Sequence, residues 1–365
     1  MKRRKFLTII GAGATAAATT KIARPAVAQS MPELKWRLTS SFPKSLDTAY
    51  GAAETLSKLV AEATDHKFQI QSFAGGEIVP PLQAIDAVSN GTVEMCHTAA
   101  YYFIGKDPTF ALYCSVPFGL NSRQQNAWFQ DHGGQDMLNE FGKKFKIYGI
   151  AGGNTGTQMG GWFRKEINTV GDVKGLKFRI GGWAGKTMQK LGAVPQQIAG
   201  GDIYPALEKG VIDAAEWVGP YDDEKLGIYN VAKFYYYPGW WEGGTALHFF
   251  INTDKWAELP KTYQALLTAA AGYTNMDVQS KYDARNPQAL KRLLMNGTQL
   301  RPFSQAIMEA CLKASSEVNA ETSATNTDFK RIWESQKAFR DDENLWWQVA
   351  EHTYESFMIR NRGKD

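Results

Sequence analysis

One arginine is a candidate for binding an organic anion. Residues 176–180 alternate apolar and charged side chains, which is typical of a strand with one buried face, and Arg179 lies near the C-terminal end of that strand. Two glycines and the start of a helix follow, and open α/β sheets bind ligands beyond the C-terminal ends of their strands. A guanidinium group can hold a carboxylate with two hydrogen bonds, and a helix start adds positive potential. The alternative is an exposed strand arginine without a ligand.

Further polar and aromatic side chains follow other predicted strands in the same way. Two lie in a glycine-rich stretch, two end a strand, and one follows an aromatic run. They are Asn154, Gln158, Glu216, Trp217 and Glu242. Taken singly, each is explained better by a structural role, because aromatic and buried polar residues commonly serve protein cores.

The sequence carries no motif of a known catalytic centre. Gly-x-Ser-x-Gly, His-Glu-x-x-His and Cys-x-x-Cys are absent, and no two of the five histidines have metal-ligand spacing. Residues 181–187 end in Gly-Lys-Thr like a nucleotide-binding loop, but Ile180 stands where that loop requires glycine. We therefore predict that the protein is not an enzyme. Catalytic groups scattered along the chain would leave no motif, so an enzyme stays the alternative.

The N-terminus predicts export across the cytoplasmic membrane. Residues 1–28 combine a basic head, a mildly apolar middle and a small-residue cleavage site, as a signal peptide does. Arg3 and Arg4 followed by Phe6 and Leu7 indicate the twin-arginine class, with an ordinary secretory signal as the alternative. The expected location of the mature protein is the periplasm.

The charge balance gives no support for nucleic acid as a partner. Without the six basic residues of the leader, 35 basic and 37 acidic residues remain, a net charge of −2. Cys96, Cys114 and Cys311 are an odd number in an oxidising compartment. Buried free thiols are expected, and a bridge between Cys96 and Cys114 is the alternative.

The spacing of apolar residues predicts an α/β fold in two lobes. Strand-like and helix-like stretches alternate between residues 34 and 98, which indicates a mainly parallel sheet, and the same rhythm resumes between residues 146 and 218. No low-complexity linker divides the two parts, so we expect ordered crossings and a cleft that opens by a hinge. The tail at residues 329–358 is helix-like and apolar, and it packs either on its own core or on a partner subunit.

Four segments together carry a resemblance to a known family. The chain resembles the periplasmic solute-binding proteins of tripartite ATP-independent periplasmic (TRAP) transporters over nearly all of its mature part. The segments are GGEI at residues 75–78, GDVKGLKFR at 171–179, ALEKGVIDA at 206–214 and NTDKW at 252–256. The resemblance implies that two α/β lobes close around a small organic acid and that the closed protein docks on membrane subunits.

Within that family the sequence looks most similar to binders of 2-oxo acids and related monocarboxylates. The resemblance implies that Arg179 binds the substrate carboxylate, and that the substrate site also contains Gln158, Asn154, Tyr101 and Glu242. It further implies a cation held by Glu216, the backbone carbonyl of Trp217, Glu242 and Gln158.

The charges at this site favour the same arrangement. Glu216 and Glu242 would repel a carboxylate unless a cation lay between them, and oxygen ligands suit Na⁺ or Ca²⁺, with Na⁺ favoured. A short 2-oxo acid such as pyruvate is the expected ligand, and lactate, a dicarboxylate or a sugar acid is the alternative. Related proteins exchange a long C-terminal helix, so a homodimer is possible.

The resemblance also implies boundaries for the two lobes. Lobe I is expected at residues 31–156 plus 246–284, lobe II at residues 157–245 plus 285–328, and a C-terminal helix at residues 329–365.

Overall fold

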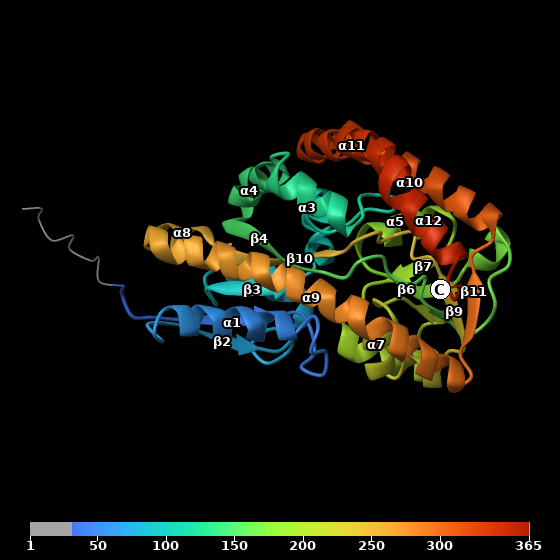
Figure 1. The fold of residues 1–365 in the computed structure, drawn as a ribbon, viewed down its shortest axis with the longest axis horizontal. Helices are drawn as coiled ribbons and strands as arrows, with labels where there is room; N and C mark the ends of the chain where they lie inside the picture. The colour runs from blue at the N-terminus through green and yellow to red at the C-terminus, as the bar shows by residue number, and fades with distance from the viewer. Residues whose placement is uncertain (1–30, 365) are drawn as a thin grey trace, which may run out of the picture.

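The computed structural model describes residues 31–364, and the predicted signal peptide at residues 1–28 lies outside them. The chain folds around two β-sheets, each of which forms the centre of one lobe (Figure 1). The first sheet has the order β2-β1-β3-β10-β4, and the second has the order β11-β9-β5-β8-β6-β7. The first contains β1 (Leu34–Ser40), β2 (Phe68–Phe73), β3 (Met95–Thr98), β4 (Ile147–Asn154) and β10 (Ala246–Asn252). The second contains β5 (Trp162–Phe163), β6 (Lys177–Arg179), β7 (Val194–Gln196), β8 (Ala214–Ala215), β9 (Phe234–Tyr237) and β11 (Gln299–Pro302).

Both sheets are mainly parallel, as the sequence predicts, but each contains one antiparallel strand. Strand β10 runs antiparallel to β3 and β4, and strand β5 runs antiparallel to β8 and β9. These two strands enter their sheets directly after the chain has crossed from the other lobe. Such a strand arrives without a helical crossover, so it is not held to the parallel direction of a βαβ unit.

Helices cover both sheets and join the lobes. The α-helices are α1 (Gly51–Ala63), α2 (Ala84–Ser89), α3 (Ser122–Gln130), α4 (Gly134–Gly142), α5 (Gly182–Lys190), α6 (Ile203–Glu208), α7 (Pro220–Lys225), α8 (Thr253–Glu258), α9 (Lys261–Met295), α10 (Gln305–Thr325), α11 (Thr327–Trp347) and α12 (Thr353–Arg360). A π-helical turn, Gln348–His352, joins α11 to α12. Short 3₁₀ turns occur at Pro81–Gln83, Ala100–Phe103, Pro108–Tyr113, Lys143–Phe145, Val170–Val173, Gly200–Asp202 and Ile228–Asn230.

Helix α9 is the longest connection between the lobes. It runs along the molecule past α1 and β4 of the first lobe and past α7 of the second lobe (Figure 1). Its buried side chains recur at intervals of three and four residues, as in Leu267, Ala271, Thr274 and Val278, so one face of the helix packs on the protein. Helix α9 therefore contacts both lobes of the two-lobed fold. The lobe boundaries given above stay a prediction.

The C-terminal helices are covered over only part of their length. Phe329 and Ile332 at the start of α11 are fully buried, so this part of the apolar tail packs on the core of the same chain. Beyond it, Leu345, Trp346 and Val349 are more than half exposed, as are several apolar side chains of α12. The first half of the tail thus packs on the core of its own chain, and packing on a partner subunit stays an explanation for the exposed second half.

Two further observations concern the whole described chain. Cys96, Cys114 and Cys311 are buried free thiols, so the alternative of a bridge between the first two is wrong for this structure. Within residues 31–364, none of the helices combines the length and the apolar character that a membrane span requires.

Candidate functional site

A small cavity lies between the two lobes. Both lobes contribute to its wall, which is mostly apolar and contains a few polar side chains. The lining residues are Phe42, Ala49, Ala99, Tyr101, Tyr102, Thr155, Gln158, Trp217, Val218, Thr245, Leu247 and Tyr282. The space open to the centre of a water molecule is about 10 Å³, which is about enough for one water. The lobes are thus drawn close together, and a ligand would enter only when they part.

Arg179 is buried, with 1% of its surface exposed. It is not one of the lining residues given above, but it lies over the ring of Trp217, which is one of them. Its Nε donates to the carbonyl oxygen of Ile198 at 3.0 Å, and Nη1 donates to the backbone carbonyl of Glu216 at 2.7 Å and to the Glu216 carboxylate. Nη2 has no hydrogen-bond partner among the described residues. The interpretation of Arg179 as an exposed strand residue is therefore wrong, and one end of its guanidinium group is available for a ligand.

The local chain explains how Arg179 reaches the cleft. Strand β6 lies between β7 and β8, and the Arg179 carbonyl accepts the Glu216 amide at 3.0 Å, which holds the ends of β6 and β8 together. Gly182 opens helix α5 with φ +52°, and a Cβ there would lie 2.5 Å from the Tyr101 side chain. Only glycine combines that backbone conformation with such close packing. The glycine turn thus brings Tyr101 of the first lobe to the end of β6.

Two buried carboxylates face the same region. Glu216 accepts the Gly181 amide at 2.7 Å through Oε1, while its Oε2 has no partner within the described part of the chain. Glu242 accepts the Thr245 hydroxyl at 2.7 Å. Gln158 donates through Nε2 to Thr155 at 3.1 Å and to Thr245 at 2.9 Å, which turns its unpartnered Oε1 away from these hydroxyls. Two acceptor oxygens are thus buried without a donor.

Burial and mutual repulsion shift the pKa values of these carboxyl groups. Burial raises the pKa of Glu242 to about 8, and the charge of Glu216 adds to the shift, whereas Thr245, Arg179 and Tyr101 oppose it. Burial also raises the pKa of Glu216, against the opposing effects of Arg179 and the Gly181 amide. An additional positive charge between the two carboxylates would favour the ionised form of both.

Trp217 and Tyr101 line the cavity from opposite lobes. The guanidinium carbon of Arg179 lies 5.0 Å from the centre of a Trp217 ring, a distance at which the ring face stabilises a cation. The Trp217 indole N–H is buried without an acceptor in the region described. Tyr101 stays close enough to Glu242 to lower the pKa of that carboxyl group.

Asn154 is buried at the end of β4, but its side chain is engaged elsewhere. Nδ2 donates to Gln125 at 2.8 Å, and Oδ1 accepts the Gly156 amide at 2.9 Å. These bonds shape the glycine-rich turn that carries Gln158. Contact between Asn154 and a substrate stays a prediction.

Sequence reasoning missed several residues of the site. Thr155 and Thr245 orient Gln158 and Glu242, and Phe42, Tyr102 and Tyr282 form part of the wall. The sequence could have pointed only to the threonines. Thr155 belongs to the glycine-rich stretch that also contains Gln158, and Thr245 lies three residues after Glu242.

The residues present fit a hard cation bound together with a ligand. Among residues 31–364, no three His, Cys, Asp or Glu side chains gather into a metal-binding group. The predicted set contains only two such side chains, Glu216 and Glu242, and needs the Gln158 amide oxygen, a backbone carbonyl and ligand oxygens to be complete. The unpartnered oxygens of Glu216 and Gln158 are the donor type that Na⁺ and Ca²⁺ accept.

Known proteins resemble this chain over most of its length. The family model "Bacterial extracellular solute-binding protein, family 7" matches residues 39–326. A monocarboxylate 2-oxoacid-binding periplasmic protein of a Nostoc species is 48% identical over 363 residues, which are 98% of this chain and 99% of that protein.

The chain is also similar to proteins whose structures have been solved. A TRAP transporter solute-binding protein from Bordetella bronchiseptica, with calcium and picolinate bound, is 48% identical with a TM-score of 0.90, covering 91% of this chain and 99% of that chain. A TRAP periplasmic solute-binding protein from Pseudoalteromonas atlantica, with sodium and pyruvate, is 36% identical with a TM-score of 0.86, covering 89% and 99%. One from Colwellia psychrerythraea, with calcium and pyruvate, is 34% identical with a TM-score of 0.86 and the same coverage.

These matches confirm the resemblance inferred from the four sequence segments, the two-lobed fold and a location outside the cytoplasmic membrane. The chain belongs to the family 7 bacterial extracellular solute-binding proteins, the solute-binding proteins of TRAP transporters.

Proposed function

We propose that this protein captures a short 2-oxo acid such as pyruvate together with Na⁺ or Ca²⁺ and delivers it to the membrane subunits of a TRAP transporter. One observation carries the proposal. Both Nη2 hydrogens of the buried Arg179 lack an acceptor, while Glu216 Oε2 and Gln158 Oε1 lack a donor, within the part of the chain that the structure describes. Buried polar atoms without partners are rare in folded proteins, and a bound ligand is one common reason for them.

The unpartnered donor and the unpartnered acceptors would bind different partners, the acid and the cation. Arg179 Nη2 supplies two N–H groups for the acid's carboxylate, while Nη1 stays tied to Glu216. Glu216, Glu242, Gln158 and the Trp217 carbonyl would hold the cation. When bound, the cation screens the two glutamates and attracts the carboxylate and keto oxygens of the acid. The relatives from P. atlantica and C. psychrerythraea, which hold pyruvate with sodium or calcium, support this assignment.

The cavity favours a small monocarboxylate over a dicarboxylate. Its lining includes apolar side chains such as Phe42, Val218 and Leu247. Arg179, which lies over the lining residue Trp217, is the only lysine or arginine that is buried in the described chain. A second carboxylate would therefore be buried without a fixed positive charge, which is costly. Lactate or a sugar acid stays the alternative, because a hydroxyl can replace a keto oxygen beside a cation.

A calorimetric screen tests the proposal. Pyruvate, lactate and succinate are titrated into the protein in the presence of Na⁺, of Ca²⁺, and of chelator in sodium-free buffer. We expect the tightest binding for pyruvate with a cation, and recovery of unchanged pyruvate after incubation, as for a carrier without catalytic activity. Equal binding of succinate, or turnover of the bound acid, would contradict the proposal.

We also propose that the exposed half of the C-terminal helices mediates a homodimer. Leu345, Trp346, Val349 and Phe357 expose more than half of their surfaces within one stretch of helix, and a partner helix would bury them. Sedimentation analysis over a range of concentrations is expected to give twice the monomer mass for the mature chain. A Trp346→Glu, Val349→Glu variant is expected to sediment as a monomer with unchanged pyruvate affinity. A monomeric wild type would contradict this proposal.

A further inference from the structure

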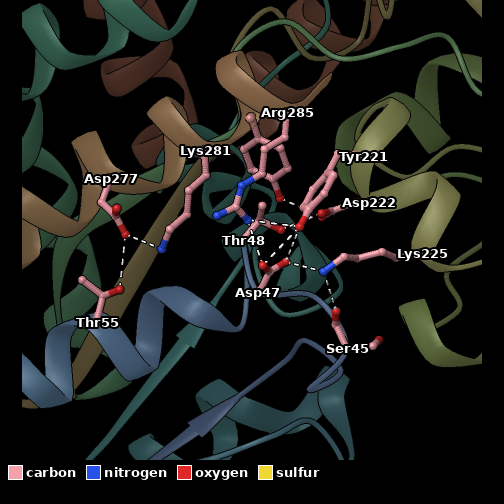
Figure 2. A network of polar contacts seen from close by, with 11 residues as sticks. Ser45, Asp47, Thr48, Thr55, Tyr221, Asp222, Lys225, Asp277, Lys281 and Arg285 are labelled. Atoms are coloured by element: carbon pink, nitrogen blue, oxygen red, sulfur yellow. Dashed lines mark hydrogen bonds and ion pairs between the residues drawn. The ribbon is translucent and has the colours of Figure 1, made fainter. Parts of the chain in front are cut away.

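A cluster of polar side chains joins the two lobes beside the cleft (Figure 2). The first lobe contributes the loop after β1, the second lobe contributes helix α7, and the connecting helix α9 contributes its middle part. The residues of this cluster are Ser45, Asp47, Thr48, Tyr221, Asp222, Lys225, Tyr282 and Arg285. None of them belongs to the substrate or cation set proposed above, although the Tyr282 ring lines the cavity.

The outer half of the cluster is an ion-pair network centred on Asp47. Lys225 pairs with the Asp47 carboxylate, Arg285 donates to it at 2.8 Å, and the Tyr221 hydroxyl lies 3.1 Å from both of its oxygens. Lys225 also donates to the Ser45 carbonyl at 3.3 Å. The Asp47 side chain is 49% exposed, so water and salt screen these contacts and each contributes little.

The inner half is centred on Asp222, which is fully buried. Its Oδ1 accepts the Thr48 hydroxyl of the first lobe at 2.6 Å, and its Oδ2 accepts the Tyr282 hydroxyl of α9 at 2.8 Å. The Asp222 carboxylate of the second lobe thus binds both the first lobe and helix α9. Hydrogen bonds to a charged, buried group are stronger than exposed ion pairs, so the inner half dominates.

We propose that these contacts form an interlobe latch, in which Asp222 is the main positioning residue and Asp47 a weaker one, and that the latch sets how long the cleft stays closed over a bound acid. The Thr48–Asp222 bond exists only while the lobes are together, because its two ends belong to different lobes. Tyr282 connects the latch to the ligand, since its ring faces the cavity and its hydroxyl binds Asp222. The inference rests on the proposed capture of an acid in the cleft.

The neighbouring carboxylate provides a matched control. Asp223 is as buried as Asp222, but its partners are Trp162 at 2.8 Å, Tyr235 at 2.6 Å and the amides of Val218 and Gly219 at 3.1 Å each. All of these lie in the second lobe. A change at Asp223 therefore alters the stability of that lobe without breaking a contact between lobes.

The test measures the dissociation rate of pyruvate and Ca²⁺ from the mature protein by stopped flow. Thr48→Val removes the hydroxyl that crosses the cleft, and we expect dissociation about tenfold faster, the effect of one hydrogen bond to a charged group. Thr48→Ser keeps the hydroxyl and is expected to dissociate like the wild type. Asp47→Asn is expected to give an increase of about two- to fivefold that fades at high salt.

The distance between spin labels on the two lobes supplies a second readout. Thr48→Val is expected to lower the fraction of closed molecules, whereas Asp223→Asn is expected to leave it unchanged. Wild-type dissociation rates and distances in Thr48→Val, or equal effects in Thr48→Val and Asp223→Asn, would overturn the latch. If the wild type binds no pyruvate with either cation, the proposed function fails, and the ligand-free distance distribution of Thr48→Val still decides on the latch.

Discussion

Two pairs of buried carboxylates, Asp222 with Asp223 and Glu216 with Glu242, differ in their surroundings. Asp222 and Asp223 have hydrogen-bond donors for their oxygens, supplied by hydroxyl, indole and amide groups of the protein. Glu216 also has two donors, the Arg179 guanidinium and the Gly181 amide, but both bind Oε1, so its Oε2 has none within residues 31–364. Glu242 accepts the Thr245 hydroxyl. Both aspartates have pKa values raised by burial to about 6, whereas that of Glu242 reaches about 8.

We interpret the difference as one between a pair whose oxygens are satisfied within the protein and the proposed binding pair. A protein that buries a carboxylate for structural reasons surrounds it with donors, because an unsatisfied charge costs more than a satisfied one. Glu216 instead keeps one buried carboxylate oxygen without a donor among the described residues, which is the state that a ligand or cation from outside would complete.

The largest effect is expected at Arg179. Arg179→Ala removes the guanidinium group proposed to hold the acid and leaves the ligand's carboxylate buried without its counter-charge, at a cost of about 2 to 5 kcal/mol. Calorimetry should therefore show pyruvate binding weakened by roughly 30-fold to several thousand-fold. The control is Arg301→Ala, since Arg301 pairs with Glu166 on the surface of the same lobe. Near-wild-type affinity in Arg179→Ala would show that Arg179 does not bind the acid.

A smaller loss is expected when the cation is removed. In sodium-free buffer with chelator, Glu216 and Glu242 would face the acid's carboxylate without a positive charge between them, so pyruvate binding should weaken by about 10- to 150-fold, the effect of one interaction with a charged group. The measurement is calorimetric titration before and after adding back Na⁺ or Ca²⁺. Unchanged affinity without a cation would assign the glutamates a structural role like that of the aspartates.

The sequence predicted the main features of the site but not its internal bonds. The alternation around Phe178, followed by two glycines, was enough to expect Arg179 at a strand end. The partners of its guanidinium group, Ile198 and Glu216, lie 19 and 37 residues further on, and no local pattern reveals such pairing. The one antiparallel strand in each sheet was missed for a similar reason, because local periodicity does not reveal the direction from which a strand enters a sheet.

Contacts that depend on how the lobes dock were beyond the sequence altogether. Asp47 and Thr48 lie in a loop without helical or strand periodicity, and their partners lie more than 170 residues away. The apolar tail illustrates the same limit, since its pattern predicted a covered stripe without indicating that Phe329 is buried and Trp346 exposed.

A pH dependence is expected for the binding pair. The pKa of Glu242 is raised to about 8 by burial and by Glu216, so this carboxyl group is mostly protonated at pH 6 and must lose its proton to bind a cation. Below pH 8, Ca²⁺ affinity should therefore rise by up to about tenfold per pH unit and then level off. Calcium titrations between pH 5.5 and 9 measure this slope. Glu242→Gln should bind Ca²⁺ more weakly and lose most of the slope, and an equal slope in that variant would locate the proton elsewhere.

The smallest effect on binding is expected at the structural pair, at Asp223. In Asp223→Asn, the amide oxygen can still accept the Val218 and Gly219 amides, but the amide N–H then meets the two side-chain donors, so the free energy of unfolding should fall by about 1 to 3 kcal/mol. Denaturant titration measures this loss. Pyruvate affinity should stay within about twofold of the wild type, because no bond between the lobes is broken and the bond to Val218 of the cavity wall is kept.

The pH dependence of stability should change as well. Burial raises the folded-state pKa of Asp223 to about 6, so the folded protein holds more protons than the unfolded chain between about pH 4 and 6, and wild-type stability falls as pH rises through that window. Asp223→Asn should lose part of this fall. A large loss of pyruvate affinity in a folded Asp223→Asn protein would instead make the second aspartate part of the binding machinery and end the distinction between the two pairs.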